Sequence, residues 1–130
     1  MTVSPVYLHF VGDYITQSNW MATEKVKRWL PAALHGTIYT LPFALLTRSP
    51  VALVTIGGTH MIIDHYRLAK HVIWTKNHIL SPGTIQPSWA EAKESGGFGK
   101  EMPAWMSTWL MILTDNIIHV TINDAAIRWL

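Results

Sequence analysis

Histidine and aspartate occur together three times along the chain at a spacing of four residues. The pairs are His9–Asp13, His60–Asp64 and Asp115–His119. On an α-helix, side chains four residues apart lie on the same face, with Cβ atoms about 6 Å apart. At that separation, an imidazole nitrogen and a carboxylate oxygen can bind one metal ion or two neighbouring ions. Four aspartates and seven histidines in 130 residues would give about 0.4 such pairs by chance, so the repetition predicts a shared metal site.

Each pair lies in an apolar segment of the sequence, where an ionised side chain needs a counter-charge or a metal ion. A fourth apolar segment contains a single histidine, His35. For one pair alone, a buried hydrogen bond between histidine and aspartate would be the simpler interpretation. Three pairs and His35 together favour metal ligation. The predicted ligands are His9, Asp13, His35, His60, Asp64, Asp115 and His119.

The residue types limit which ion is expected. Mixed histidine and aspartate ligands suit Zn²⁺, Mn²⁺ or Fe²⁺, and a pool of this size suits one or two divalent transition-metal ions. The chain has no cysteine, so thiolate ligands, disulfides and a cysteine nucleophile are excluded. Any metal ion must therefore be held by nitrogen and oxygen.

Other polar side chains lie next to the predicted ligands. Gln17 extends the first pair by four residues and Asn123 extends the last pair by four, so either amide could orient a ligand or contact a substrate. Arg67 follows the middle pair and could bind an anionic substrate. A solvated helix end would explain this arginine equally well.

The composition is that of a folded domain with few charges. Of the 130 residues, 49% are hydrophobic and only 14% are charged, against about a quarter charged in an ordinary soluble domain. This excludes a disordered tail and a basic protein that coats nucleic acid. The formal net charge of +2 is too small to indicate a polyanionic partner. We expect one domain over residues 1–130.

Apolar segments separated by prolines and polar turns predict an all-α fold, a compact bundle of about four main helices. The segments are Val6 to about Met21, Leu30–Thr47, Val51–Ile63 with a polar continuation to about Trp74, and residues 102–130. Pro42 would kink the second of them. Residues 76–101 are punctuated by glycine and proline, which predicts a long loop before the last helix that could cover the site.

Membrane association is left open by the sequence. Leu30–Thr47 reaches only the lower limit of a membrane span, which needs roughly 20 apolar residues. Basic clusters at Lys25–Arg28 and Arg67–Lys70 could lie at one cytoplasmic face, whereas acidic residues in the apolar segments argue against lipid. The amino terminus lacks the features of a secretory signal. We expect a cytoplasmic protein or one at the cytoplasmic face of the inner membrane, not a secreted one.

The segments at residues 9–20, 60–65 and 115–119, together with Lys25 and His35, resemble an uncharacterised domain family of small phage and bacterial proteins. The shared pattern is a His-x3-Asp with a trailing Gln and Trp, a lysine, a lone histidine, a second His-x3-Asp and an Asp-x3-His. It covers nearly the whole chain except residues 76–101. The resemblance implies that Lys25 lies beside the ligands or contacts the substrate.

More distantly, this layout is similar to that of membrane-bound metal-dependent hydrolases and of helical zinc phosphoesterases. The chain lacks the amino-terminal tryptophan ligand of the zinc phosphoesterases, which puts a trinuclear cluster in doubt. It also lacks the adjacent His-Asp pair of the HD phosphohydrolases, because Asp64 and His65 occur in the reverse order.

These observations predict a metal-dependent hydrolase that acts on a phosphoester, such as a nucleotide, a nucleic acid or a phospholipid headgroup. Asp64 and Asp115 are the candidate catalytic residues, and Asp115 is the candidate general base. The alternative is a metal-stapled or membrane-embedded helical protein, without enzymatic activity, that binds a host protein. A third possibility is a helical bundle that conducts protons or ions. The oligomeric state is not predicted.

Overall fold

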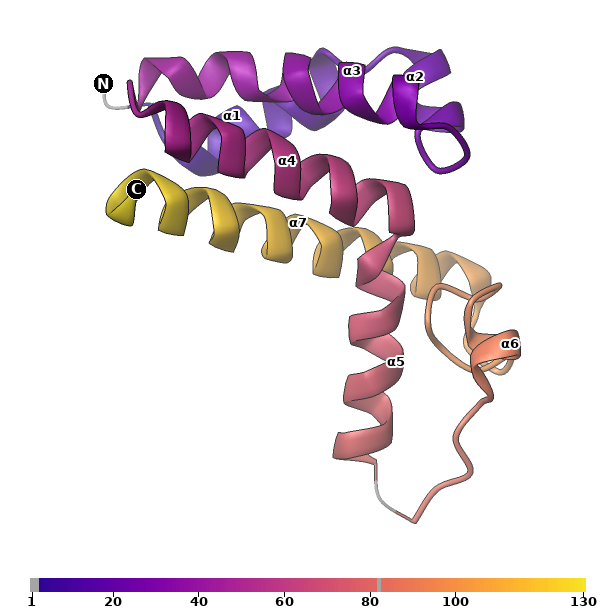
Figure 1. Cartoon of the computed structure of the whole chain (residues 1–130). Coiled ribbons are helices and arrows are strands. Elements are labelled where there is room, and N and C mark those ends of the chain that lie inside the picture. The colour runs from indigo at the N-terminus through magenta and orange to yellow at the C-terminus, as the bar shows by residue number, and fades with distance from the viewer. Residues whose placement is uncertain (1–2, 82) are drawn as a thin grey trace. The chain divides into compact units, whose positions relative to one another are not determined.

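The computed structural model describes residues 3–81 and 83–130, and every regular element in these ranges is a helix (Figure 1). The all-α prediction is therefore confirmed. The elements are α1 (Pro5–Phe10), the π-helix η1 (Val11–Ile15), α2 (Asn19–Glu24), α3 (Trp29–Thr40), the 3-10 helix η2 (Leu41–Leu45), α4 (Pro50–Tyr66), α5 (Leu68–Leu80), α6 (Trp89–Ala92) and α7 (Ala104–Trp129).

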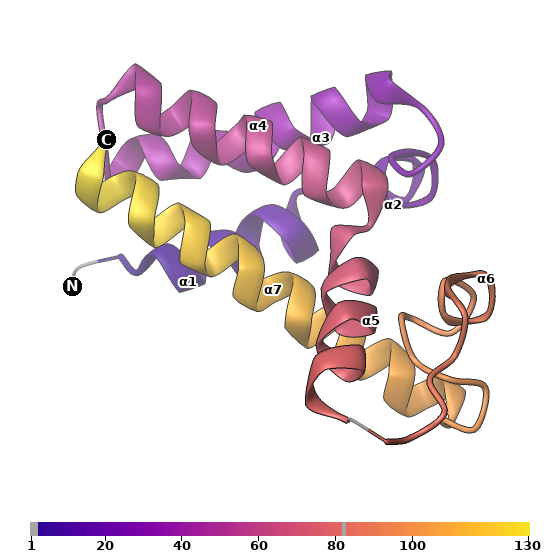
Figure 2. The same cartoon turned by 60° about the horizontal axis from the view of Figure 1, so that its bottom comes forward.

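The chain divides into two compact units. The first contains the chain up to Tyr66 together with His119–Leu130, and the second contains Arg67–Ile118. Helix α7 contributes its carboxyl-terminal part to the first unit and the rest to the second. Within the first unit, α3 and α4 lie side by side in both views (Figures 1 and 2). Its core contains Leu8, Tyr39, Phe43, Ile56 and Ala126.

The first apolar segment forms three short helices, which corrects the single helix expected there. The Ser4 hydroxyl accepts a hydrogen bond from the Val6 amide at the start of α1, and the chain then widens into η1, where the Thr16 amide donates to the Val11 carbonyl five residues earlier. Such π-helical turns are rare and often occur at functional sites. Ser18 caps α2 in the same way as Ser4 caps α1.

Two further helix ends are set by Pro42 and by Arg67, which has a left-handed backbone conformation. Pro42 has no amide hydrogen to continue an α-helix, so α3 ends at Thr40 and the chain tightens into η2 instead of kinking. The third segment does not continue to about Trp74 as one helix. Arg67 has φ 51° and ψ 50°, a left-handed conformation that costs a non-glycine residue about 1–2 kcal/mol, and it separates α4 from α5.

The expected loop over residues 76–101 is shorter and more ordered than the sequence indicates. Helix α5 extends to Leu80, and α6 begins at a capping box formed by Ser88 and Glu91. Within the second unit, the Trp74 indole donates to the Pro87 carbonyl over 3.0 Å and Lys70 Nζ donates to the Lys93 carbonyl over 2.5 Å. These bonds attach the segment to α5. Its role as a lid stays a prediction.

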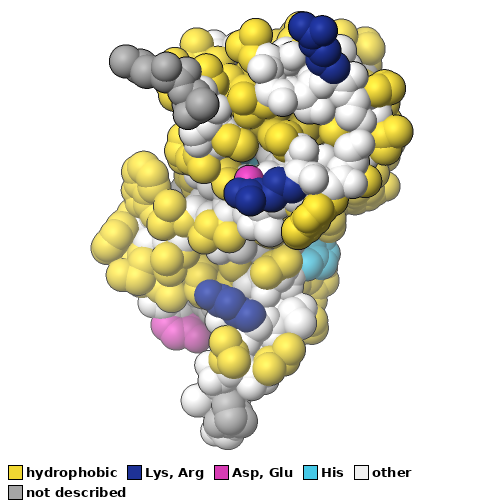
Figure 3. Space-filling model, turned by 90° about the vertical axis from the view of Figure 1, so that its left-hand side faces the viewer, with side chains coloured by type: hydrophobic (Ala, Val, Ile, Leu, Met, Phe, Trp, Pro, Cys, Tyr) yellow, Lys and Arg dark blue, Asp and Glu magenta, His cyan; other side chains and the backbone are white. Residues whose placement is uncertain are grey.

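Among the described residues, no helix has both the length and the hydropathy that a bilayer crossing requires. Many large apolar side chains are nevertheless exposed. Figure 3 shows them covering much of one face of the molecule, with few charged side chains between them.

Candidate metal centre

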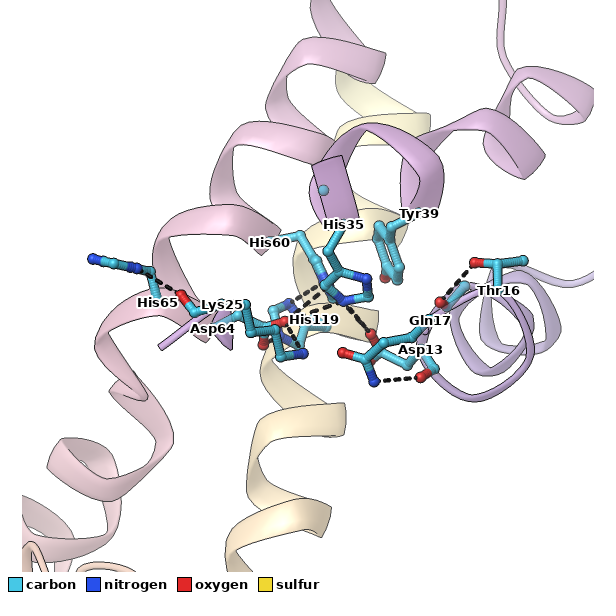
Figure 4. Close-up of polar contacts among 12 residues, drawn as sticks. Asp13, Thr16, Gln17, Lys25, His35, Tyr39, His60, Asp64, His65 and His119 are labelled. Carbon is cyan, nitrogen blue, oxygen red and sulfur yellow. Dashed lines mark hydrogen bonds and ion pairs between the residues drawn. The ribbon is translucent and has the colours of Figure 1, made fainter. Parts of the chain in front are cut away.

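Two histidines and two aspartates meet in the interior of the first unit. Asp13 comes from η1, His35 from α3, and His60 and Asp64 from α4, and we call them the four-residue cluster (Figure 4). Both histidines are fully buried, and the two aspartates are 8% and 6% exposed. The Nε2 atoms of His35 and His60 are 2.9 Å apart. Each histidine Nε2 also lies 3.1–3.3 Å from an oxygen of both carboxylates.

These separations match those of a tetrahedral metal site. Four ligand atoms form six pairs, and the five pairs just given span 2.9–3.3 Å. Bonds of 2.0–2.1 Å to a tetrahedral Zn²⁺ place ligand atoms about 3.3 Å apart. One ligand atom from each residue lies within 4.8 Å of all the others. The four donors therefore lie close enough together to bind one metal ion.

Hydrogen bonds within the cluster shift the pKa values of three of its four members. Burial raises the pKa of Asp13, but hydrogen bonds from His35 and His60 outweigh burial and hold this pKa below its usual value. Burial likewise raises the pKa of Asp64, and bonds from His119, His35 and His60 lower it further than burial raises it. Burial lowers the pKa of His35, while its bonds to the two carboxylates raise it above 6.5. A metal ion would displace protons from this site.

Tyr39 links the cluster to two more buried residues, and the sequence analysis missed it. Its ring stacks on that of His60, with centroids 3.6 Å apart and an interplanar angle of 11°. Its hydroxyl accepts a hydrogen bond from Asn123 Nδ2 over 2.5 Å and lies 2.8 Å from His9 Nδ1. His9 Nε2 is in turn 3.6 Å from Asp13 Oδ2. Because Tyr39 follows His35 by four residues, helical spacing places both on one face, a signal that was available in the sequence.

Asp64 connects the cluster to His119 and Lys25. Asp64 Oδ1 lies 3.2 Å from His119 Nε2, and Oδ2 lies 2.5 Å from the Lys25 ammonium. His119 Nδ1 is also 3.2 Å from His60 Nδ1. The Lys25 side chain is 15% exposed, so it is a mostly buried cation rather than part of a solvated basic turn. The carbonyl of Lys25 is 2.7 Å from His65 Nδ1.

Of the remaining predicted residues, one supports the site and two belong to the second unit. Gln17 Nε2 donates to the backbone carbonyl of Asp13 over 2.9 Å, which stabilises the turn after η1. Asp115 precedes His119 by one turn of α7 but belongs to the second unit, as does Arg67. The structure therefore brings six of the seven predicted ligands together in the first unit, and the roles of Asp115 and Arg67 stay predictions.

A comparison with protein families matches residues 3–80 to the family described as "Protein of unknown function (DUF3307)". The chain belongs to this family. The DUF3307 match includes the four-residue cluster, Gln17 and Lys25. It ends before Asp115, His119 and Asn123, so the resemblance does not reach the Asp-x3-His segment that it was expected to cover.

No curated protein matches the chain, and no solved structure does. Similarity to membrane-bound metal-dependent hydrolases, or to the helical zinc phosphoesterases, is therefore not shown. Membership of DUF3307 assigns no reaction to the four-residue cluster.

Proposed function

We propose that the chain is a metal-dependent hydrolase that acts on a phosphoester and holds its ion at the four-residue cluster. The observation that supports this most is the tetrahedral spacing of four buried ligand atoms on His35, His60, Asp13 and Asp64. A divalent ion bound there would lower the pKa of a bound water toward neutrality and polarise a phosphoryl group. Zn²⁺, Mn²⁺ and Fe²⁺ all suit these donors.

Lys25 supports an anionic substrate. Its ammonium already contacts Asp64 Oδ2, and once that carboxylate ligates an ion, the ammonium is available to a phosphate oxygen. Tyr39 and Asn123 would hold the histidine rings in orientation. His9 and His119 would supply donors for a second ion. Asp115 remains our candidate general base.

A structural metal site is the alternative, and one observation favours it. The four-residue cluster alone offers four ligand atoms and is buried, whereas catalytic zinc sites keep one position open. Cobalt(II) substitution separates the two functions, because its visible absorption reports coordination. We expect inorganic phosphate to change the spectrum of the cobalt protein. A four-coordinate spectrum that does not respond to phosphate would assign the site a structural role.

Hydrolysis tests the enzymatic proposal directly. We expect purified protein to cleave at least one member of a panel of chromogenic phosphodiesters, nucleotides and phospholipids in the presence of Mn²⁺, Zn²⁺ or Mg²⁺. Asp13→Asn, Asp64→Asn and Asp115→Asn should each lower the rate at least about 100-fold, because each removes a charged donor or base. Asp124→Asn is the matched control, since Asp124 is exposed and pairs with Arg128. Activity that survives a chelator or Asp64→Asn would contradict the proposal.

Metal affinity should rise with pH. A ligating histidine must be neutral, and the pKa of His35 is raised above 6.5, so protons compete with the ion below that pKa. Asp13 and Asp64 remain ionised there, because their pKa values are lowered. Titration calorimetry between about pH 5 and 8 should show affinity increasing about tenfold per pH unit for each proton displaced, until His35 is neutral. An affinity independent of pH would contradict this. In metal-free protein, the stability that His35 contributes is present below 6.5 and is lost as the pH rises through its raised pKa.

A further inference from the structure

Helices α3, η2 and α4 expose a row of large aliphatic side chains on the first unit. Leu30, Leu34 and Leu41 follow helical spacing along one side of α3 and the start of η2. The row continues on η2 and α4. We call the set the apolar face, and its members are Leu30, Leu34, Leu41, Leu45, Val51 and Val54, each 41–75% exposed.

The two helices form one continuous surface because they approach closely. A Cβ on Gly36 would lie 3.0 Å from the Gly57 carbonyl, so glycine at this position allows the backbones to meet. A shallow groove runs along their junction, lined by Leu41 of η2 and Val54 of α4 among others. A Cβ on Gly58, which also lines the groove, would meet nothing within 4 Å. The groove is thus open at Gly58.

The segment that carries this face contains basic residues and no acidic ones. Residues 25–63 contain no aspartate or glutamate, and their basic residues are Lys25, Lys27, Arg28 and Arg48. Lys25 and Lys27 contact acids outside that range, Asp64 and Glu24. Arg28 directly precedes α3 and Arg48 follows η2, and both are exposed. An exposed arginine therefore lies at each end of the apolar row.

We propose that the apolar face docks on the surface of a membrane that contains anionic lipids. Aliphatic side chains on helices that lie parallel to a bilayer enter the boundary between headgroups and acyl chains. Arginines at both ends extend their stems along apolar surface and place the guanidinium among lipid phosphates. The charge pattern favours lipid over a protein partner. The polar groups within the face are hydroxyls such as those of Thr37 and Thr40, which donate to carbonyls of their own helix. The charged arginines lie at its ends.

Vesicle flotation tests the proposal with the full chain. We expect binding to vesicles of phosphatidylcholine mixed with phosphatidylglycerol, weaker binding to phosphatidylcholine alone, and a decrease with salt. The double variant Leu45→Glu/Val54→Glu should lower partitioning at least about tenfold, because it removes apolar burial at the centre of the face. The matched control Ile79→Glu/Leu80→Glu, which changes two exposed residues of α5, should bind normally.

Arg28→Gln/Arg48→Gln should weaken binding to anionic vesicles about fivefold per arginine and leave binding to neutral vesicles unchanged. Circular dichroism verifies that each variant keeps its helix content, and Leu30→Gln/Leu34→Gln replaces the glutamate pair if that pair unfolds. Equal binding of the wild type to both vesicle types would overturn the proposal. So would wild-type binding by the variants in which leucine or valine of the apolar face is replaced. So would a dimer of the wild type that these substitutions dissociate, since the face would then contact a second copy.

Discussion

Saturating Zn²⁺ should raise the stability of the wild-type protein by about 4 kcal/mol when its concentration is a thousand times Kd. The reason is that the two histidines and two aspartates of the four-residue cluster already lie at ligand spacing in the folded chain, whereas an unfolded chain holds no such site. For a domain of this size, the gain corresponds to a rise in Tm of roughly 10–20 °C. Thermal unfolding followed by circular dichroism, with and without Zn²⁺, measures it.

Histidine variants supply the control for this stabilisation. His35→Ala/His60→Ala removes both nitrogen donors of the cluster and should abolish the rise in Tm. His71→Ala/His78→Ala removes two exposed histidines of α5 and should leave the rise intact. An equal response of both double variants would mean that Zn²⁺ stabilises the protein from some other site.

Loss of Asp64 should be the most destabilising single aspartate substitution in metal-free protein. Its carboxylate faces the Lys25 ammonium at 2.5 Å and His60 Nε2 at 3.1 Å, and the mostly buried ammonium would be left without a counter-charge. Removing one partner of a buried ion pair costs about 3–5 kcal/mol. Denaturant unfolding of Asp64→Ala, measured with a chelator present, should show a loss of that size.

Two further variants make this measurement specific. Asp124→Ala breaks an exposed pair with Arg128 and should cost no more than about 0.5 kcal/mol. Lys25→Met added to Asp64→Ala should recover part of the loss, because the uncompensated ammonium is removed with its partner. Similar losses for Asp64→Ala and Asp124→Ala would contradict the arrangement of charges around Lys25.

The sequence was sufficient to predict the helical class and most of the cluster. Histidine and aspartate four residues apart share a helix face whichever helix carries them, and apolar neighbours turn that face inward. His60 and Asp64 on α4 behave as this rule requires. His35 also joins them, because it lies on the buried side of α3 together with Ala32 and Tyr39.

The resemblance placed Lys25 beside the ligands, but the partner that Lys25 contacts there depends on tertiary structure. Lys25 follows α2 in a basic segment, and nothing in the local pattern shows that its chain folds back on Asp64. Tyr39 is one of four tyrosines. Its spacing of four residues from His35 indicates a shared helix face, but only the structure shows its contacts with His9 and His60.

The predicted helix boundaries were wrong because of local changes in backbone conformation. A π-helical turn at η1 and a left-handed Arg67 both interrupt segments whose hydropathy continues unchanged. The periodicity of apolar residues indicates which face of a helix is apolar. It does not indicate where the backbone changes from one helical conformation to another. The predicted long helices at residues 6–21 and 51–74 were wrong for that reason.

Metal content is the measurement that tests the central claim most directly. Elemental analysis of protein purified without chelator, or reconstituted with Zn²⁺, Mn²⁺ or Fe²⁺ and then desalted, should give one or two ions per chain. The double variant His60→Ala/Asp64→Ala should lose most of this metal, and His71→Ala/His78→Ala should retain it. Normal metal content in the first variant, or a wild-type protein that binds none of these ions, would contradict the account.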